Sequence, residues 1–189
     1  EGLPLFGIGR DATIKNLNIY GKKIAGYALV EKYTIDYGID GNYNTGCPKT
    51  ATIENVTIKS GTQVLKGGLI GGFGSGANTV QLTNCTAEKG VVIGYSQKPG
   101  GDGSWNGPIG SFASSLNGVV TNCVSYADVY GINNVGGIAG VKGQSMGPCL
   151  VSNCEFYGTV NATGRFAGGI LGAGYDGGGT APNTPVATV

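Results

Sequence analysis

Apolar and polar residues alternate along this chain in short blocks that recur from one end to the other. In the first kind of block, an apolar residue stands two positions before an asparagine, and apolar or small residues stand one and three positions after it. Five asparagines, separated by 39, 29, 38 and 31 residues, carry this block: Asn16, Asn55, Asn84, Asn122 and Asn153. A period of roughly 20–50 residues is typical of solenoids and other repeat folds.

The phase of the apolar positions predicts two short strands that meet at each asparagine. Side chains two residues apart on a strand share a face. The apolar residues lie two positions before each asparagine and one and three positions after it, so the inward-facing positions shift by one residue at the asparagine. We expect a corner there, with the asparagine amides bonded to one another in an internal ladder. The inward column that follows the corner contains Leu17, Val56, Cys85, Cys123 and Cys154. The polar outer column that precedes it contains Lys15, Glu54, Thr83, Thr121 and Ser152.

A second block alternates with the first and consists of an apolar residue, a variable residue and a small residue. Its six copies are Leu5-Phe6-Gly7, Ile39-Asp40-Gly41, Leu69-Ile70-Gly71, Ile109-Gly110-Ser111, Ile138-Ala139-Gly140 and Ile170-Leu171-Gly172. The small residue predicts a close backbone approach that a Cβ would obstruct. Together the blocks predict an all-β parallel β-helix, a solenoid of about five to six coils stacked about 4.8 Å apart. It would span residues 1–175, with 176–189 as a linker-like tail or the start of a further coil.

Composition narrows the class of protein further. The 189 residues include 38 glycines, 40% hydrophobic and 12% charged residues, and the net charge is +1. This apolar content excludes a disordered chain, and the absence of a Lys/Arg cluster argues against a nucleic-acid partner. No apolar run reaches about 18 residues, so we expect no membrane insertion. We also expect little helix, because no stretch has a 3.6-residue apolar period.

The residues that are missing limit the chemistry. The chain has no histidine, which excludes imidazole as a general base and as a metal ligand. Five cysteines are an odd number, so a monomer cannot pair them all. Cys85, Cys123 and Cys154 share one inward column, and we interpret them as stacked buried thiols rather than as metal ligands. We therefore predict no metal centre.

The Gly-Gly-Ile-x-Gly form of the second block, as in Gly136-Gly-Ile-Ala-Gly140, resembles the GLUG-type repeats of bacterial cell-surface proteins. Over residues 2–175 the arrangement is similar to the right-handed, pectate-lyase-like β-helices of secreted bacterial proteins. The resemblance implies a secreted or cell-wall-associated protein of the cell surface, with a role in adhesion or carbohydrate binding. No catalytic residue can be carried over from it.

The spacing between blocks predicts two inserted loops. The distance from each asparagine to the next second block is 23, 14, 25, 16 and 17 residues. The first and third coils thus have extra residues at the same point of the repeat. We expect these inserts to flank a groove whose floor lies near residues 61–66. Long loops on a rigid scaffold are where function tends to concentrate.

The inserts contain the residues of a sugar-binding site. Aromatic rings cover the apolar faces of a pyranose, and carboxylates bind its hydroxyl groups. The candidate binding residues are Tyr33, Tyr37, Tyr43, Tyr95, Asp102 and Trp105. Two alternatives remain open: Trp105 packs on its own scaffold, and Asp102, in Gly-Gly-Asp-Gly, serves as a turn residue.

Asp36 and Asp40 are weak candidates for catalysis, because glycosidases use two carboxylates about 5–9.5 Å apart. Asp40 falls in a column that is otherwise apolar or small, where an acid needs a partner or has a raised pKa. Asp40, Asn42 and Asn44 also begin like a calcium loop. That loop lacks glycine at its sixth position and the acid that follows downstream, so we expect no cofactor.

The leading hypothesis is a non-catalytic module of a secreted bacterial surface protein, a scaffold that binds a carbohydrate or host-surface glycan. The alternative is part of a β-helix glycoside hydrolase or polysaccharide lyase that uses Asp36 and Asp40. A third possibility is a spacer. Because an open coil has unpaired N–H and C=O groups, we also expect end-to-end stacking with another copy or with the rest of a longer β-helix. The glycosylation sequons at Asn55 and Asn84 are discounted, since both asparagines belong to the expected internal ladder.

Overall fold

The computed structural model describes residues 5–8, 12–33, 50–73, 79–94, 107–116, 118–142 and 149–173. All regular structure in these ranges is β, so the expectations of an all-β chain and of little helix are confirmed there. Accordingly, the described part of the chain holds no helix that could cross a membrane.

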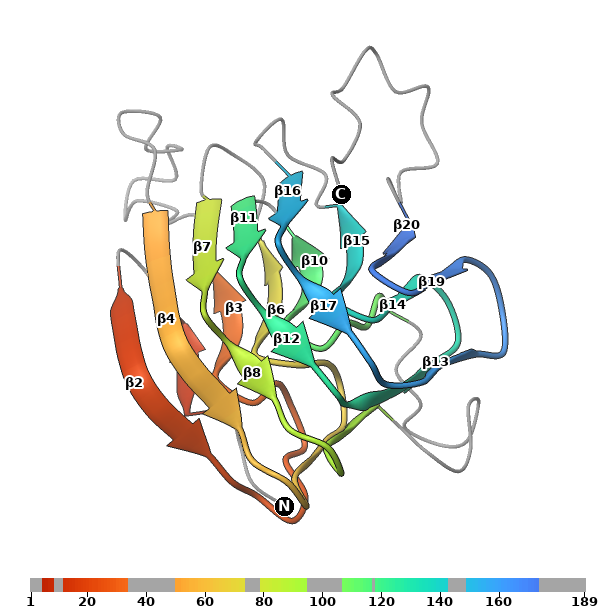
Figure 1. Cartoon of the computed structure of the whole chain (residues 1–189), viewed down its shortest axis with the longest axis horizontal. Coiled ribbons are helices and arrows are strands. Elements are labelled where there is room, and N and C mark those ends of the chain that lie inside the picture. Colours follow the sequence, from red (N-terminus) through yellow and green to blue (C-terminus); the bar gives the residue numbers. More distant parts are fainter. Residues whose placement is uncertain are drawn as a thin grey trace, which may run out of the picture.

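The strands form four sheets that curl around a common interior (Figure 1). The six-stranded sheet contains β1 (Phe6–Ile8), β3 (Val30–Tyr33), β6 (Ile70–Phe73), β10 (Ala113–Leu116), β15 (Ala139–Lys142) and β20 (Leu171–Ala173). The eight-stranded sheet contains β2 (Thr13–Ile19), β4 (Thr50–Ile58), β7 (Thr79–Thr83), β8 (Thr86–Ala87), β11 (Gly118–Thr121), β12 (Val124–Ser125), β16 (Cys149–Ser152) and β17 (Glu155–Phe156). The two smaller sheets contain β5 (Gln63–Val64), β9 (Val92–Gly94), β13 (Asp128–Gly131) and β18 (Val160–Ala162), and β14 (Val135–Gly136) and β19 (Ala167–Gly168).

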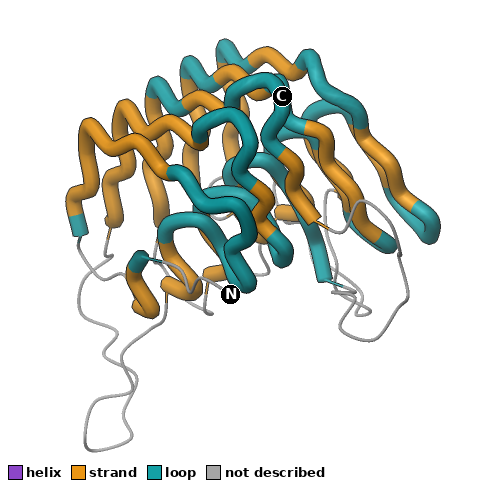
Figure 2. Tube along the Cα trace, turned by 90° about the horizontal axis from the view of Figure 1, so that it is seen from below, coloured by secondary structure: helices purple, strands orange, loops and turns teal. Residues whose placement is uncertain are grey.

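Neighbouring strands run parallel and come from successive repeats of the sequence. In the eight-stranded sheet, Ile53 lies opposite Ile14 on one side and Leu82 on the other. The same register continues from Leu82 through Val120 to Val151. Figure 2 shows how similar bends of the chain recur side by side along the molecule. Equivalent residues of the first block therefore form columns that cross the sheet.

A left-handed backbone at each repeated asparagine turns the chain. These five asparagines have φ values between 51° and 57°, a region in which asparagine is much more common than branched or bulky residues. β7 and β8, β11 and β12, and β16 and β17 meet at such a residue, whereas β2 and β4 continue through it. The predicted corner between two strand segments is confirmed.

The asparagine side chains lie outside the molecule, so the prediction of an internal ladder is wrong. All five are exposed, and the Asn55 Nδ2 atom donates to the Asn16 Oδ1 atom over 2.7 Å on the surface. The flanking residues explain the exposure, because Leu17 and its equivalents already occupy the inward position after the corner. The sequons at Asn55 and Asn84 are thus on the surface, and the reason for discounting them does not hold.

The inward columns of the first block form the core. Ile53, Val56 and Ile58 of β4 have no exposed surface, and burial of each such side chain contributes roughly 1.5–3 kcal/mol. Cys85 and Cys123 are fully buried in the same column as Val56, which confirms their predicted inward position. Among the described residues, the apolar side chains that pack on the core but stay partly exposed belong to the first and last repeats, as at Leu17 and Phe156.

The register of the six-stranded sheet corrects the alignment of the second block. Val30 lies opposite both Phe6 and Ile70, so the column position assigned to Asp40 belongs to Val30. Ala113, not Gly110, is the next member of that column. In the sequence, the copies of the second block were aligned by their small third residue. In the sheet, the aligned feature is instead a pair of adjacent buried apolar residues, such as Leu29-Val30 and Phe112-Ala113.

This register also shows that the two inserts do not occupy the same point of the repeat. Val30 follows Asn16 by 14 residues, much as Ile70 follows Asn55 by 15. The extra residues of the first region, 34–49, therefore connect β3 to β4, whereas residues 95–106 belong to the connection between β9 and β10, which spans residues 95–112. The premise that both inserts leave the scaffold at the same point of the repeat is therefore wrong, whereas the predicted groove itself falls on residues outside the described ranges.

Substitution of Gly137 tests the close contact between repeats. A Cβ at Gly137 would collide with the Gly169 carbonyl oxygen and would lie 2.5 Å from Cγ of Phe156. We expect Gly137→Ala to lower the free energy of unfolding by about 1–3 kcal/mol, as overpacking does. Gly169→Ala is the matched control, because a Cβ at Gly169 has no heavy atom within 4 Å, and we expect a change within about 0.5 kcal/mol. Urea denaturation measures both, and equal losses would contradict the register.

Candidate functional site

Most residues of the predicted sugar site lie outside the described ranges. These are Asp36, Tyr37, Asp40, Tyr43, Tyr95, Asp102 and Trp105, together with Asn42 and Asn44 of the calcium-like sequence. For Tyr33 the structure gives the backbone only, at the end of β3 opposite Phe73. The roles suggested for all these residues stay predictions.

The described residues contain a different candidate, a column of outward side chains that immediately follow strands β2, β4, β8, β12 and β17 of the eight-stranded sheet. We call it the tyrosine column, and its members are Tyr20, Lys59, Glu88, Tyr126 and Tyr157. Each follows an inward residue, such as Ile19, Ile58 or Ala87, and so points to solvent. Backbone bonds between successive repeats hold the column in register, from Lys59 N to Ile19 O at 2.8 Å through to Tyr157 N to Ser125 O at 2.8 Å.

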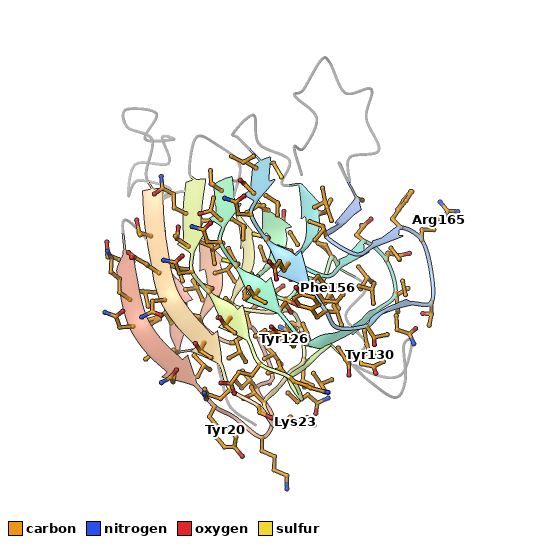
Figure 3. The ribbon with its side chains drawn as sticks, in the orientation of Figure 1. Tyr20, Lys23, Tyr126, Tyr130, Phe156 and Arg165 are labelled. Carbon is orange, nitrogen blue, oxygen red and sulfur yellow. The ribbon has the colours of Figure 1, made fainter. Side chains whose placement is uncertain are left out.

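Tyrosine rings occupy both ends of this column. Tyr20 is 70% exposed and Tyr157 is 62% exposed. Tyr126 stacks on Tyr157 with ring centroids 5.1 Å apart and an interplanar angle of 14°, which matches the spacing of adjacent strands. The Tyr157 hydroxyl donates to Glu155 Oε2 over 2.6 Å, and this bond raises the pKa of Tyr157. Figure 3 shows Tyr20 projecting from the edge of the fold. Tyr126 is exposed as well, whereas the neighbouring Phe156 is half-buried and packs on the core.

An ion pair occupies the middle of the column. Lys59 Nζ donates to the Glu88 carboxylate, which also accepts the Ser60 N–H over 2.9 Å. The bond from Lys59, followed by that from Ser60, lowers the pKa of Glu88. The pair therefore places a cation and an anion between aromatic rings. Three strand spacings separate Tyr20 from Tyr126, which corresponds to about 14 Å.

This arrangement is suited to binding. Flat rings offer apolar faces, and the lysine and glutamate offer hydrogen-bond donors and acceptors for hydroxyl groups. Within the described ranges, no group of three or more His, Cys, Asp or Glu residues could hold a metal ion.

The tyrosine column was missed by sequence reasoning, although a signal was present. Each member stands four positions after a repeated asparagine. The recurring pattern of the first block extends only from two positions before the asparagine to three after it. The next position contains no single residue type, and its common outward orientation becomes evident only when the strands are aligned.

A second cluster is the row of thiols formed by Cys85, Cys123 and Cys154, none of which is in a disulfide. The Cys85 backbone N–H donates to Cys123 Sγ over 3.3 Å, and Cys154 Sγ lies 3.3 Å from the Ser152 carbonyl oxygen. The hydrogen bond with Cys123 lowers the pKa of Cys154 to about 7. The pKa of Cys123 is raised, first by that bond and then by its bond with Cys85. The hydrogen bond with Cys123 lowers the pKa of Cys85 as well, but Cys85 and Cys123 are buried, whereas Cys154 is half-buried.

Replacement of Lys59 tests the ion pair. Because folding lowers the pKa of Glu88, the pair stabilises the fold above the ordinary carboxyl pKa of 4.5. This stabilisation is lost as the pH falls through the folded pKa. We expect Lys59→Met to shift the titration midpoint of Glu88 upward in a carbon-detected NMR titration. Lys15→Met, which removes the partner of Glu54 at 2.7 Å, should leave the Glu88 midpoint unchanged. An unchanged Glu88 midpoint in Lys59→Met would contradict the ion pair between Lys59 and Glu88.

Alkylation tests the order of thiol reactivity. With a pKa of about 7, Cys154 should react with iodoacetamide in the folded protein at a rate that rises with a midpoint near pH 7, because the thiolate is the nucleophile. The buried Cys85 and Cys123 should remain protected until the chain unfolds. Peptide mapping by mass spectrometry after short pulses measures each site, with Cys154→Ser as the control. Labelling of Cys123 at the rate of Cys154 would contradict this order.

A comparison with known proteins finds no relative, since no family model, curated protein or solved structure matches the chain.

Proposed function

We propose that this chain is a right-handed parallel β-helix module that acts as a scaffold and binds glycans along the tyrosine column. The β-helix part of the proposal is supported by the parallel pairing of successive repeats in all four sheets. It is further supported by the corner asparagines, which bend every repeat at the same place. Parallel connections are right-handed in nearly all known cases.

The observation that carries the binding proposal is the alignment of exposed tyrosines on one outer face. Tyr20, Tyr126 and Tyr157 account for half of the six large hydrophobic side chains that are exposed in the described ranges. Exposed apolar groups that gather in one place indicate an interaction surface. A chain of sugar rings offers both apolar faces and hydroxyl groups, and the column offers tyrosine rings at its ends and a Lys–Glu pair between them.

A secreted, cell-surface location in a bacterium is part of the same proposal and rests on the resemblance of the Gly-Gly-Ile-x-Gly blocks to GLUG-type repeats. A scaffold that holds a glycan-binding face suits such a place, because its columns of hydrogen-bonded strands are rigid and extended. The hydrolase or lyase alternative depends on Asp36 and Asp40, which lie outside the described ranges. We therefore do not propose a catalytic role.

Glycan binding is tested with an array screen followed by titration of the best ligand. We expect Tyr20→Ala to raise the Kd about tenfold, equivalent to about 1.4 kcal/mol, through loss of one ring face. Because the Tyr20 side chain is 70% exposed, the melting temperature of the Tyr20→Ala protein should differ little from that of the wild-type protein. Tyr157→Phe should retain binding if the ring face is the binding element. Tyr130→Ala is the matched control, because Tyr130 lies on β13 of another sheet and is labelled apart from the column in Figure 3.

The same measurements also show whether a glycan binds at the tyrosine column or at the predicted inserts. Trp105→Ala tests the insert that contains the tryptophan. Loss of binding in Trp105→Ala with full binding in Tyr20→Ala would move the site away from the column. Binding to no glycan at all would refute the binding role and leave the scaffold role alone.

A further inference from the structure

We propose that the chain associates head to tail with a second copy, whose first strands pair with β16, β17 and β20 of the first. This proposal concerns the two edges of the sheets and does not depend on the glycan-binding role. The edges are defined by strand order, since β1 and β2 end their sheets on one side and β16, β17 and β20 end them on the other.

Both edges leave core positions incompletely covered. Within the described ranges, the hydrophobic residues that pack on the core but are only partly buried all belong to the first and last repeats: Ile14, Leu17, Cys154, Phe156, Val160, Ala162, Ile170 and Leu171. At the first edge, Leu5 is 55% exposed. Unpaired backbone groups on such edges readily pair with another strand. Each edge thus lacks the layer that the opposite edge of a second copy could supply.

Extension of the observed register by one repeat shows that the two edges match. Tyr157 continues the column of Tyr20, so Tyr20 of the second copy would follow Tyr157 in the same column. The inward positions match as well, with Ile14 after Val151 and Leu17 after Cys154. In the six-stranded sheet, Phe6 would follow Leu171. Apolar side chains therefore meet apolar side chains along both edges.

The polar positions are compatible in the same register. Asn16 would follow Asn153 and could continue the surface amide contact seen between Asn16 and Asn55. Asn18 would lie beside Glu155, where its amide N–H can donate to an exposed carboxylate. Lys15 would lie beside Ser152. No like charges are placed opposite each other at these positions.

Such an interface is heterologous, since the two copies contribute different edges. Repetition of the same contact leaves one free edge of each kind, so growth does not close and short filaments form. The association therefore increases with concentration.

Sedimentation velocity on the full 189-residue chain over a wide range of concentrations tests the proposal. The wild-type chain should pass from monomer to a ladder of species as concentration rises. Ser152→Lys places a lysine opposite Lys15 of the second copy and should raise the concentration needed for association about fivefold. Ser152→Glu, at the same position, should lower it by a similar factor, because opposite charges attract across strands and like charges repel. Circular dichroism confirms that both variants fold.

A wild-type chain that stays monomeric at every concentration would overturn the proposal. Equal association of Ser152→Lys and Ser152→Glu would also overturn it, because the register places residue 152 opposite Lys15 of the second copy.

Discussion

Parallel hydrogen bonding between successive repeats is the constraint on which the rest of this structure depends. Once Ile53 lies between Ile14 and Leu82, every neighbouring position on these strands is also brought into register, at the spacing of adjacent strands. Side chains at equivalent positions then have no freedom to avoid one another. The stacked rings of Tyr126 and Tyr157 and the row of thiols at Cys85 and Cys123 are both consequences of this register.

The same constraint explains why small residues are needed where the chain bends between sheets. At Gly137 the backbone of the next repeat approaches so closely that no Cβ can be accommodated. The corner asparagines meet a different requirement, a positive φ that moves the following residue to the inside. Backbone geometry rather than side-chain chemistry therefore determines these positions, and the core columns depend on them.

On the described scaffold, the outer columns present the side chains that a ligand can reach, because the inner columns are buried in the core. The outer face repeats its positions but not its residues: the tyrosine column contains three rings and one ion pair. A surface of this kind combines rigidity with variable chemistry, since a substitution there changes what the surface binds without a change in the core. The edges differ from this face, because they expose core positions and unpaired backbone together.

The sequence by itself determined the repeat, the all-β class, the corner at each asparagine and the inward columns of the first block, because alternation and left-handed turns are local properties of the chain. It did not determine the alignment of Val30 with Ile70, the outward position of Asn55 or the assembly of Tyr20, Lys59 and Glu88 into one column. Those features depend on which strands pair across about 30 or 40 residues. The pattern of small residues was ambiguous about that pairing, and only the packing of repeats on one another resolved it.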